Sequence, residues 1–121
     1  MPLLLAALGC SNGGNVTVCT AIFSYQSALV VDATGAPVVA AWVVTDTVLR
    51  TTKPLVIAQQ GYPAGAATIF SDNNLNDVRA AGDSVRVSGS GGGKTFSAMY
   101  QFGSDGCHIV RISGPDTVVA R

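Results

Sequence analysis

The side chains with the most chemical potential are one histidine, three cysteines and seven aspartates, and the sequence contains no glutamate. A transition-metal site needs several nitrogen or sulfur ligands, and Cys107 would point to the opposite strand face from His108. A Cys–His nucleophilic pair would need Cys19 or Cys10, and nothing in the sequence places either beside His108. Glycoside cleavage would require two aspartates, and no pair stands out. We therefore expect no catalytic residue, metal or cofactor, and predict that the chain is not an enzyme.

A glycine-rich segment, Ser88–Thr95, comes close to the phosphate-binding pattern G-x-x-x-x-G-K-[ST], with Ser88 in the place of the first glycine. A phosphate-binding loop must also lead into a helix whose N-terminus faces the phosphates. Residues Thr95–Phe102 instead alternate between polar and apolar, as a strand does. We predict a glycine-rich hairpin loop here rather than a nucleotide site.

The polar segment Asp72–Asp77, with Asp83 eleven residues after Asp72, is similar to a calcium loop with ligands at positions 1, 3, 5 and 12. Aspartate and asparagine supply the hard oxygens that calcium prefers. However, Asp77 occupies the position that requires glycine, and the last ligand would be aspartate rather than a bidentate glutamate. A solvated turn is the favoured interpretation, and calcium binding is kept as the alternative.

Five aromatic side chains could form a patch that stacks on sugars or contacts a partner protein. They are Trp42, Tyr62, Phe96, Tyr100 and Phe102. Aromatic residues of a β-sandwich lie in its core more often than on its surface. We predict that these side chains belong to the core.

Length and charge restrict the class of protein. The chain has 121 residues, which fits one domain. Lysine and arginine number seven, aspartate also seven, and hydrophobic residues make up 48%. Such a composition disfavours disorder, and zero net charge disfavours a nucleic-acid partner. No apolar run reaches the roughly 18 residues that a membrane-spanning helix needs.

Short apolar segments separated by turn residues predict the fold. Val, Thr, Ala, Gly and Ser dominate, which favours strands and turns over helices. Val38–Val44 is apolar on both faces and is predicted to be a central or interface strand, followed by strands over Thr45–Lys53 and Leu55–Ala58. Ser84–Ser88 alternates with period two and is predicted to pair with Phe96–Phe102 as a hairpin. About seven strands of this kind indicate an all-β fold, a single antiparallel two-sheet sandwich.

The N-terminal segment Leu3–Cys10 resembles the end of a bacterial lipoprotein signal, in which the residues before the cysteine are removed and Cys10 receives lipid. Ser11–Asn15 has the composition of a flexible tether. We expect residues 1–18 to be a truncated signal-like segment with its tether, and residues 19–121 to form the sandwich. The alternative is an apolar N-terminal strand with a core cysteine.

If Cys10 carries the lipid, Cys19 and Cys107 remain as a pair in an exported, oxidising setting, and we predict a disulfide between them. Closing a loop of this length would stabilise the domain by about 4–5 kcal/mol in the chain-entropy model. The alternative is two unpaired, buried thiols.

The segment Val30–Val38 runs from a strand into D-x-x-G-x-P-V and on into another strand. This layout resembles immunoglobulin-like and carboxypeptidase regulatory-like (transthyretin-like) sandwich domains. Cys19-Thr20-Ala21 and Gly106-Cys107-His108 are similar to segments of small bacterial lipoproteins of that group. The resemblance covers about Cys19–Arg121 and implies a non-enzymatic accessory, adhesion or carbohydrate-associated module, an implication by analogy because fold does not fix function.

The sequence thus predicts a non-catalytic interaction or structural module, exported to the bacterial cell envelope or beyond it and attached to the membrane through lipid at Cys10. A self-assembling subunit of a surface structure is the first alternative, since faces with few charges associate readily. A calcium- or carbohydrate-associated binding module is the second. We expect a protein partner or a second copy of the chain, and no nucleic acid.

Overall fold

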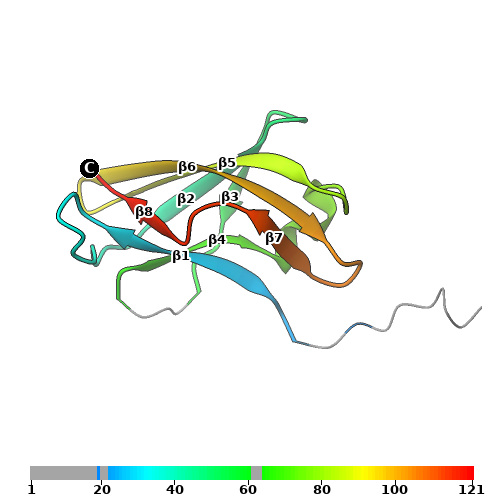
Figure 1. The fold of residues 1–121 in the computed structure, drawn as a ribbon, viewed down its shortest axis with the longest axis horizontal. Helices are drawn as coiled ribbons and strands as arrows, with labels where there is room; N and C mark the ends of the chain where they lie inside the picture. Colours follow the sequence, from blue (N-terminus) through cyan, green and yellow to red (C-terminus); the bar gives the residue numbers. More distant parts are fainter. Residues whose placement is uncertain (1–18, 20–21, 61–63) are drawn as a thin grey trace, which may run out of the picture.

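Alternating apolar and polar residues build two stacked sheets (Figure 1). The computed structural model describes residue 19, residues 22–60 and residues 64–121. The strands in this part of the chain are β1 (Tyr25–Val31), β2 (Val43–Val48), β3 (Lys53–Ile57), β4 (Ala66–Ser71), β5 (Asp83–Gly91), β6 (Lys94–Ser104), β7 (Ile109–Ser113) and β8 (Thr117–Val119). One short 3₁₀ helix, η1 (Asp72–Asp77), follows β4.

The sheets contain three and five strands, in the orders β4-β1-β8 and β3-β2-β5-β6-β7. All neighbours in the larger sheet are antiparallel. In the smaller sheet β1 and β4 are antiparallel, whereas β1 and β8 are parallel. The two-sheet sandwich predicted from the sequence is confirmed, with eight described strands instead of about seven and one parallel pair among the antiparallel ones.

The core lies between the inner faces of the two sheets. Val85 and Val87 of β5 are fully buried, whereas Arg86 between them is exposed, as the period of a half-buried strand requires. The rings of Phe70 and Phe102 stack across the core with centroids 4.4 Å apart. Burying such side chains, at about 1.5–3 kcal/mol each, is the main stabilising contribution to the fold.

The predicted hairpin is formed by β5 and β6, which pair from Asp83↔Phe102 to Gly91↔Lys94. Gly92 and Gly93 make the turn, with φ of 58° and 75°. Two-residue hairpin turns with positive φ at both positions match the twist of the strands and favour glycine. The segment that resembled a phosphate-binding loop is therefore the end of a hairpin, as predicted.

The predicted strand over Val38–Val44 is wrong, because regular pairing begins only at Val43. The preceding residues carry the chain from the smaller sheet, where β1 ends, to the larger sheet, where β2 begins. A segment that crosses between layers cannot keep a hydrogen-bonded ladder with either sheet. Its apolar side chains divide accordingly, with Trp42 buried and Val39 exposed.

The predicted strand over Thr45–Lys53 is also too long. β2 ends at Val48, and a turn follows in which Thr52 N–H and Thr51 N–H both donate to the Val48 carbonyl. Thr52 has a φ of 54° in this turn. β3 then begins at Lys53 and pairs back along β2. The segment predicted as one strand therefore contains most of β2, a turn and the first residue of β3.

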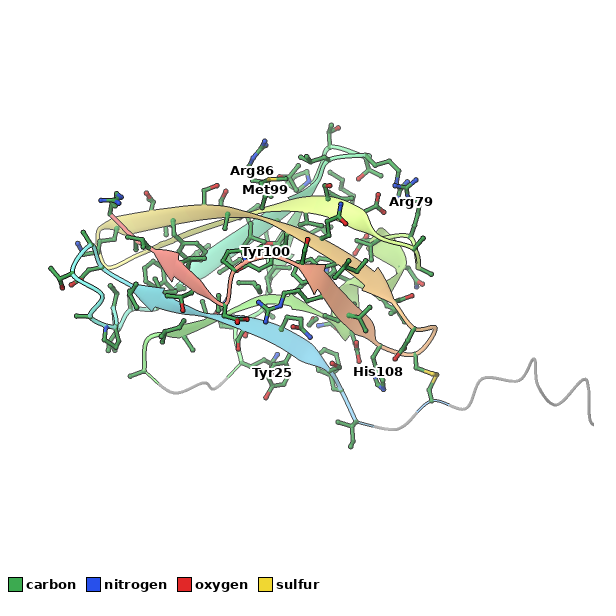
Figure 2. The ribbon with its side chains drawn as sticks, in the orientation of Figure 1. Tyr25, Arg79, Arg86, Met99, Tyr100 and His108 are labelled. Atoms are coloured by element: carbon green, nitrogen blue, oxygen red, sulfur yellow. A yellow bond between two sulfur atoms is a disulfide. The ribbon has the colours of Figure 1, made fainter. Side chains whose placement is uncertain are left out.

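Cys19 and Cys107 form the predicted disulfide, with their Cα atoms 5.2 Å apart and 88 positions apart in sequence. Cys107 lies in the connection between β6 and β7, and the bridge joins it to the residues ahead of β1. Figure 2 shows the bridge at one end of the sandwich, close to His108. This disulfide, the covalent clamp of the fold, closes a loop that contains almost the whole domain.

We predict that the disulfide is a major source of stability. Replacing both partners, Cys19→Ser with Cys107→Ser, should lower the free energy of unfolding by about 2–5 kcal/mol, because the unfolded chain regains the entropy of an open loop. Thermal unfolding under non-reducing conditions measures the effect, and a reductant should lower the Tm of the wild-type protein but leave that of the double variant unchanged. An unaltered wild-type curve after reduction would contradict the clamp.

Candidate functional site

Asp72 and His108 are brought together although 36 positions separate them in the sequence. Asp72 opens η1 at the end of β4, and His108 lies directly before β7. Asp72 Oδ2 is 2.6 Å from His108 Nδ1. The carboxylate also accepts the backbone N–H groups of Ser24, at 2.8 Å, and Ile109, at 2.9 Å. Three distant segments therefore meet on one carboxylate.

Partial burial raises the pKa of Asp72, but the hydrogen bonds from His108, Ile109 and Ser24 outweigh it and leave the pKa below its ordinary value. The carboxylate is ionised at neutral pH and fixes one ring nitrogen of His108. A carboxylate–imidazole pair is also the orienting part of a catalytic triad. In this protein the same carboxylate also accepts hydrogen bonds from two backbone N–H groups, so its role is to join segments of the fold. Sequence reasoning missed the pair because no local motif joins its members.

The turn between β6 and β7 is organised by Asp105. Its Oδ1 atom accepts the N–H groups of Cys107, at 2.9 Å, and His108, at 2.8 Å. These bonds from His108 and Cys107 lower the pKa of Asp105. The disulfide and the Asp72–His108 pair are thus fixed by the same turn.

Asp83, the other end of the calcium-like segment, serves a different cluster. Arg50 donates to its two oxygens at 2.9 and 3.0 Å, and Arg79 donates through its backbone N–H and its guanidinium. The hydrogen bonds from Arg50 hold the pKa of this buried carboxyl well below its usual range. Because Asp72 and Asp83 belong to separate networks, the segment does not gather its carboxylates as a calcium loop does. Within residues 19, 22–60 and 64–121, no three His, Cys, Asp or Glu side chains are grouped to hold a metal ion.

Asp46 is the most unusual titratable group, and the sequence interpretation overlooked it. It lies on the inner face of β2, opposite Leu55 of β3 and Val87 of β5, and is fully buried. Neither carboxyl oxygen has a hydrogen-bond partner among the described residues. Burial raises the pKa of Asp46 from 3.8 to about 8, because the charged form loses its hydration. The group is protonated at neutral pH. The sequence signal that could have identified Asp46 as an inward-facing residue is the period-two alternation of Val44–Val48.

Four of the five aromatic residues lie in the core, as predicted. Trp42 and Phe96 meet edge to face at 5.4 Å, and Tyr100 stacks on Phe102 at 5.4 Å. Burial raises the pKa of Tyr100 to about 12, and its hydroxyl donates to the Pro115 carbonyl at 2.5 Å. Tyr62 lies outside the described residues. These rings hold the sheets together and do not form an exposed stacking patch.

A shallow, open cleft of about 570 Å³ lies on the outer face of the larger sheet. Three adjacent strands supply Val43 and Thr45 from β2, Ser88 and Ser90 from β5, and Thr95 and Ser97 from β6. Val119 and Arg121 complete one side. The hydroxyl groups were not recognised in the sequence, because cross-strand neighbours are distant along the chain and their register was unknown.

Cys10, the predicted lipid site, lies outside the described residues. Within the described ranges, no helix has the length and apolar character required to cross a bilayer. Comparisons with protein-family models, curated proteins and solved structures give no match.

We predict that Asp46 makes the protein less stable as the pH rises from about 4 to 8. In this window the unfolded state has lost the proton that folded Asp46 still holds, so the free energy of unfolding falls by about 1.4 kcal/mol per pH unit. Above about pH 8 both states are ionised and this contribution to the slope disappears. Urea unfolding at several pH values measures it.

Asp46→Asn provides the comparison, because the amide has nearly the same shape and cannot ionise. The difference in unfolding free energy between variant and wild type should grow in favour of the variant from pH 4 to pH 8. Parallel pH profiles for the two proteins would show that Asp46 is ionised or solvated in the folded state, contrary to its burial.

Proposed function

We propose that the chain is a non-catalytic interaction or structural module, exported from a bacterial cell and held at its surface by lipid on Cys10. The observation that carries this proposal is the Cys19–Cys107 disulfide. Such bridges form and persist in oxidising compartments, and small exported domains use them to supplement a limited core. The bridge also leaves Cys10 as the remaining cysteine, which agrees with a lipid-bearing residue.

The position of the disulfide gives the proposed anchor a direction. Cys10 precedes Cys19 by nine residues, so the attached lipid would lie within roughly 30 Å of the bridge. The disulfide marks one end of the sandwich, and the end of β8 with Arg121 lies at the other (Figures 1 and 2). A lipid on Cys10 would keep the disulfide end near the membrane and present the opposite end to the surroundings.

The roles of the polar clusters support a non-catalytic module. Asp72 joins Ser24, His108 and Ile109, and Asp83 joins Arg50 and Arg79. Each carboxylate has its oxygens directed at protein groups that fix loops to strands. These contacts stabilise connections in the fold, which is what a scaffold that presents a surface requires.

Lipid attachment is tested on the native protein extracted from membranes. Intact-mass and peptide mass spectrometry should find an N-terminus at Cys10 bearing diacylglycerol, and a Cys10→Ser variant expressed in the same cells should lose both the lipid and the membrane fraction. An unmodified chain that still begins at Met1 in the native host would contradict the proposal.

Self-assembly is the second candidate, favoured by the exposed apolar side chains Val43 and Val56 on the outer face of the larger sheet. Two sheet edges carry features that work against self-assembly. Gln59 pairs its amide with the backbone of Thr68 on the edge of β4, at 2.9 and 3.2 Å, and Pro54 interrupts the edge of β3. Side chains of these kinds are features that limit edge-to-edge association.

We predict that the purified protein stays monomeric at high concentration, since two of its sheet edges are blocked. Light scattering coupled to size exclusion should give a mass near 12.3 kDa for the unprocessed chain. Large particles that disappear in a Val56→Thr variant would instead establish assembly through the outer face.

A further inference from the structure

We propose that the cleft on the outer face of the larger sheet binds an acidic saccharide, a sugar chain that carries carboxylates. This inference deepens the proposed function, on which it rests, by naming the ligand class of the exported module. The register of the strands, the unused hydrogen-bonding groups of the cleft and the distribution of charge support it.

The register places the cleft residues in two rows that cross the sheet. Thr45, Ser88 and Ser97 are cross-strand neighbours in one row. Val43, Ser90 and Thr95 form the next row. Because side chains alternate along a strand, all six point outward, while their neighbours Val44, Val87 and Phe96 are buried beneath them.

The residues after β8 extend the second row. Thr95 exchanges two backbone hydrogen bonds with Arg121, at 3.0 and 2.9 Å, so the chain after β8 lies directly beside the start of β6. Val119 and Arg121 therefore border the hydroxyl rows. The cleft spans side chains from four neighbouring segments, which gives it room for more than one sugar ring.

The cleft presents hydrogen-bonding groups that the protein does not use. Thr45, Ser88, Ser90, Thr95 and Ser97 all carry hydroxyls, and none of these hydroxyls bonds to another described residue. A hydroxyl is both a donor and an acceptor, which matches the hydroxyls of a sugar. The methyl groups of Val43 and Val119 at the borders can contact the C–H faces of sugar rings.

Charge selects the acidic form of the ligand. Arg121 lines the cleft, and Arg86 lies outside the lining on the same outer face, two residues along β5 from Ser88 of the first row. Figure 2 shows Arg86 and Met99 directed away from the core on this face. Neither arginine forms an ion pair with the side chain of another described residue, and no aspartate side chain lines the cleft. A guanidinium binds a carboxylate through two parallel hydrogen bonds, which makes a uronic acid a complementary ligand.

The pairing of the strands under the cleft favours a saccharide over an acidic peptide as the ligand. An extended peptide commonly binds by adding a strand to an open sheet edge. The cleft instead covers β2 and β5, which are paired on both sides, and the start of β6, where Thr95 is paired with Ser90 and with the backbone of Arg121. Over β2 and β5 only side chains are available to a ligand, and most of those that line the cleft carry hydroxyls. The start of β6 and the chain end at Arg121, which border the cleft, lie at the end of the sandwich remote from the disulfide, where a lipid-anchored module would present them outward (Figures 1 and 2).

The test is a titration of the ¹⁵N-labelled full chain with a hexasaccharide of uronic acid, the neutral hexose hexasaccharide and a hexaglutamate peptide. The uronate should shift the amide signals of the two rows and bind at least about tenfold more tightly than either of the others. Its affinity should fall as the salt concentration rises, since an exposed ion pair is screened. Absence of uronate binding, or tighter binding of the peptide, would overturn the inference.

Matched variants locate the site. Arg121→Ala and the double substitution Thr45→Val with Ser88→Ala should each weaken uronate binding by about tenfold, with unchanged circular dichroism. Lys94→Ala is the control, because it removes a positive charge beside Thr95 from the opposite face of β6, and it should alter the affinity less than twofold. If Lys94→Ala and Arg121→Ala weaken uronate binding equally, the effect comes from net charge alone, and the proposal that the cleft is the binding site is overturned. These results are independent of lipid on Cys10, so either proposal can fail while the other stands.

Discussion

Phe70 of the smaller sheet and Phe102 of the larger one stack at 4.4 Å, and this contact joins the two layers at the centre of the core. Tyr100 continues the stack along β6. Once these rings are buried, the inward or outward direction of every residue in β5 and β6 is fixed, because a shift by one residue would exchange the two faces. The outer rows of hydroxyls are therefore a consequence of the aromatic packing on the inside.

The same core contains a group that opposes its stability. Protonated Asp46 lies among apolar neighbours, and at pH 7 the cost relative to an acid that never ionises is about 4 kcal/mol, from the difference between its folded and ordinary pKa. The chain-entropy contribution of closing the Cys19–Cys107 loop is of similar size, about 4–5 kcal/mol. A domain that keeps an unpaired acid in its core thus depends more strongly on its covalent clamp than a purely apolar sandwich of this size would.

Much of the fold could be predicted from local sequence patterns. Alternation in Ser84–Ser88 and the glycines after it determined the β5–β6 hairpin, and the cysteine count led to the disulfide. Hydrophobicity alone failed in Val38–Trp42, because this connection between the two sheets is as apolar as a strand although Val39 is exposed and only Trp42 is buried. The Asp72–His108 pair and the outer cleft could not be predicted, since each depends on which strands are neighbours. Asp46 could have been found, as it interrupts the inner face of a strand that otherwise alternates.

Net charge is a poor guide to the surface of this protein. All seven aspartates of the chain lie in turns, in connections, at strand ends or in the core. None lies on the outer face of β2, β5 or β6, where Arg86 is exposed. At physiological salt a ligand responds to charges within about 8 Å, so it meets this arginine-bearing face and not the neutral average of the molecule. Zero net charge argues against a long polyanion that would contact many faces at once, but leaves open a short acidic chain that fits one of them.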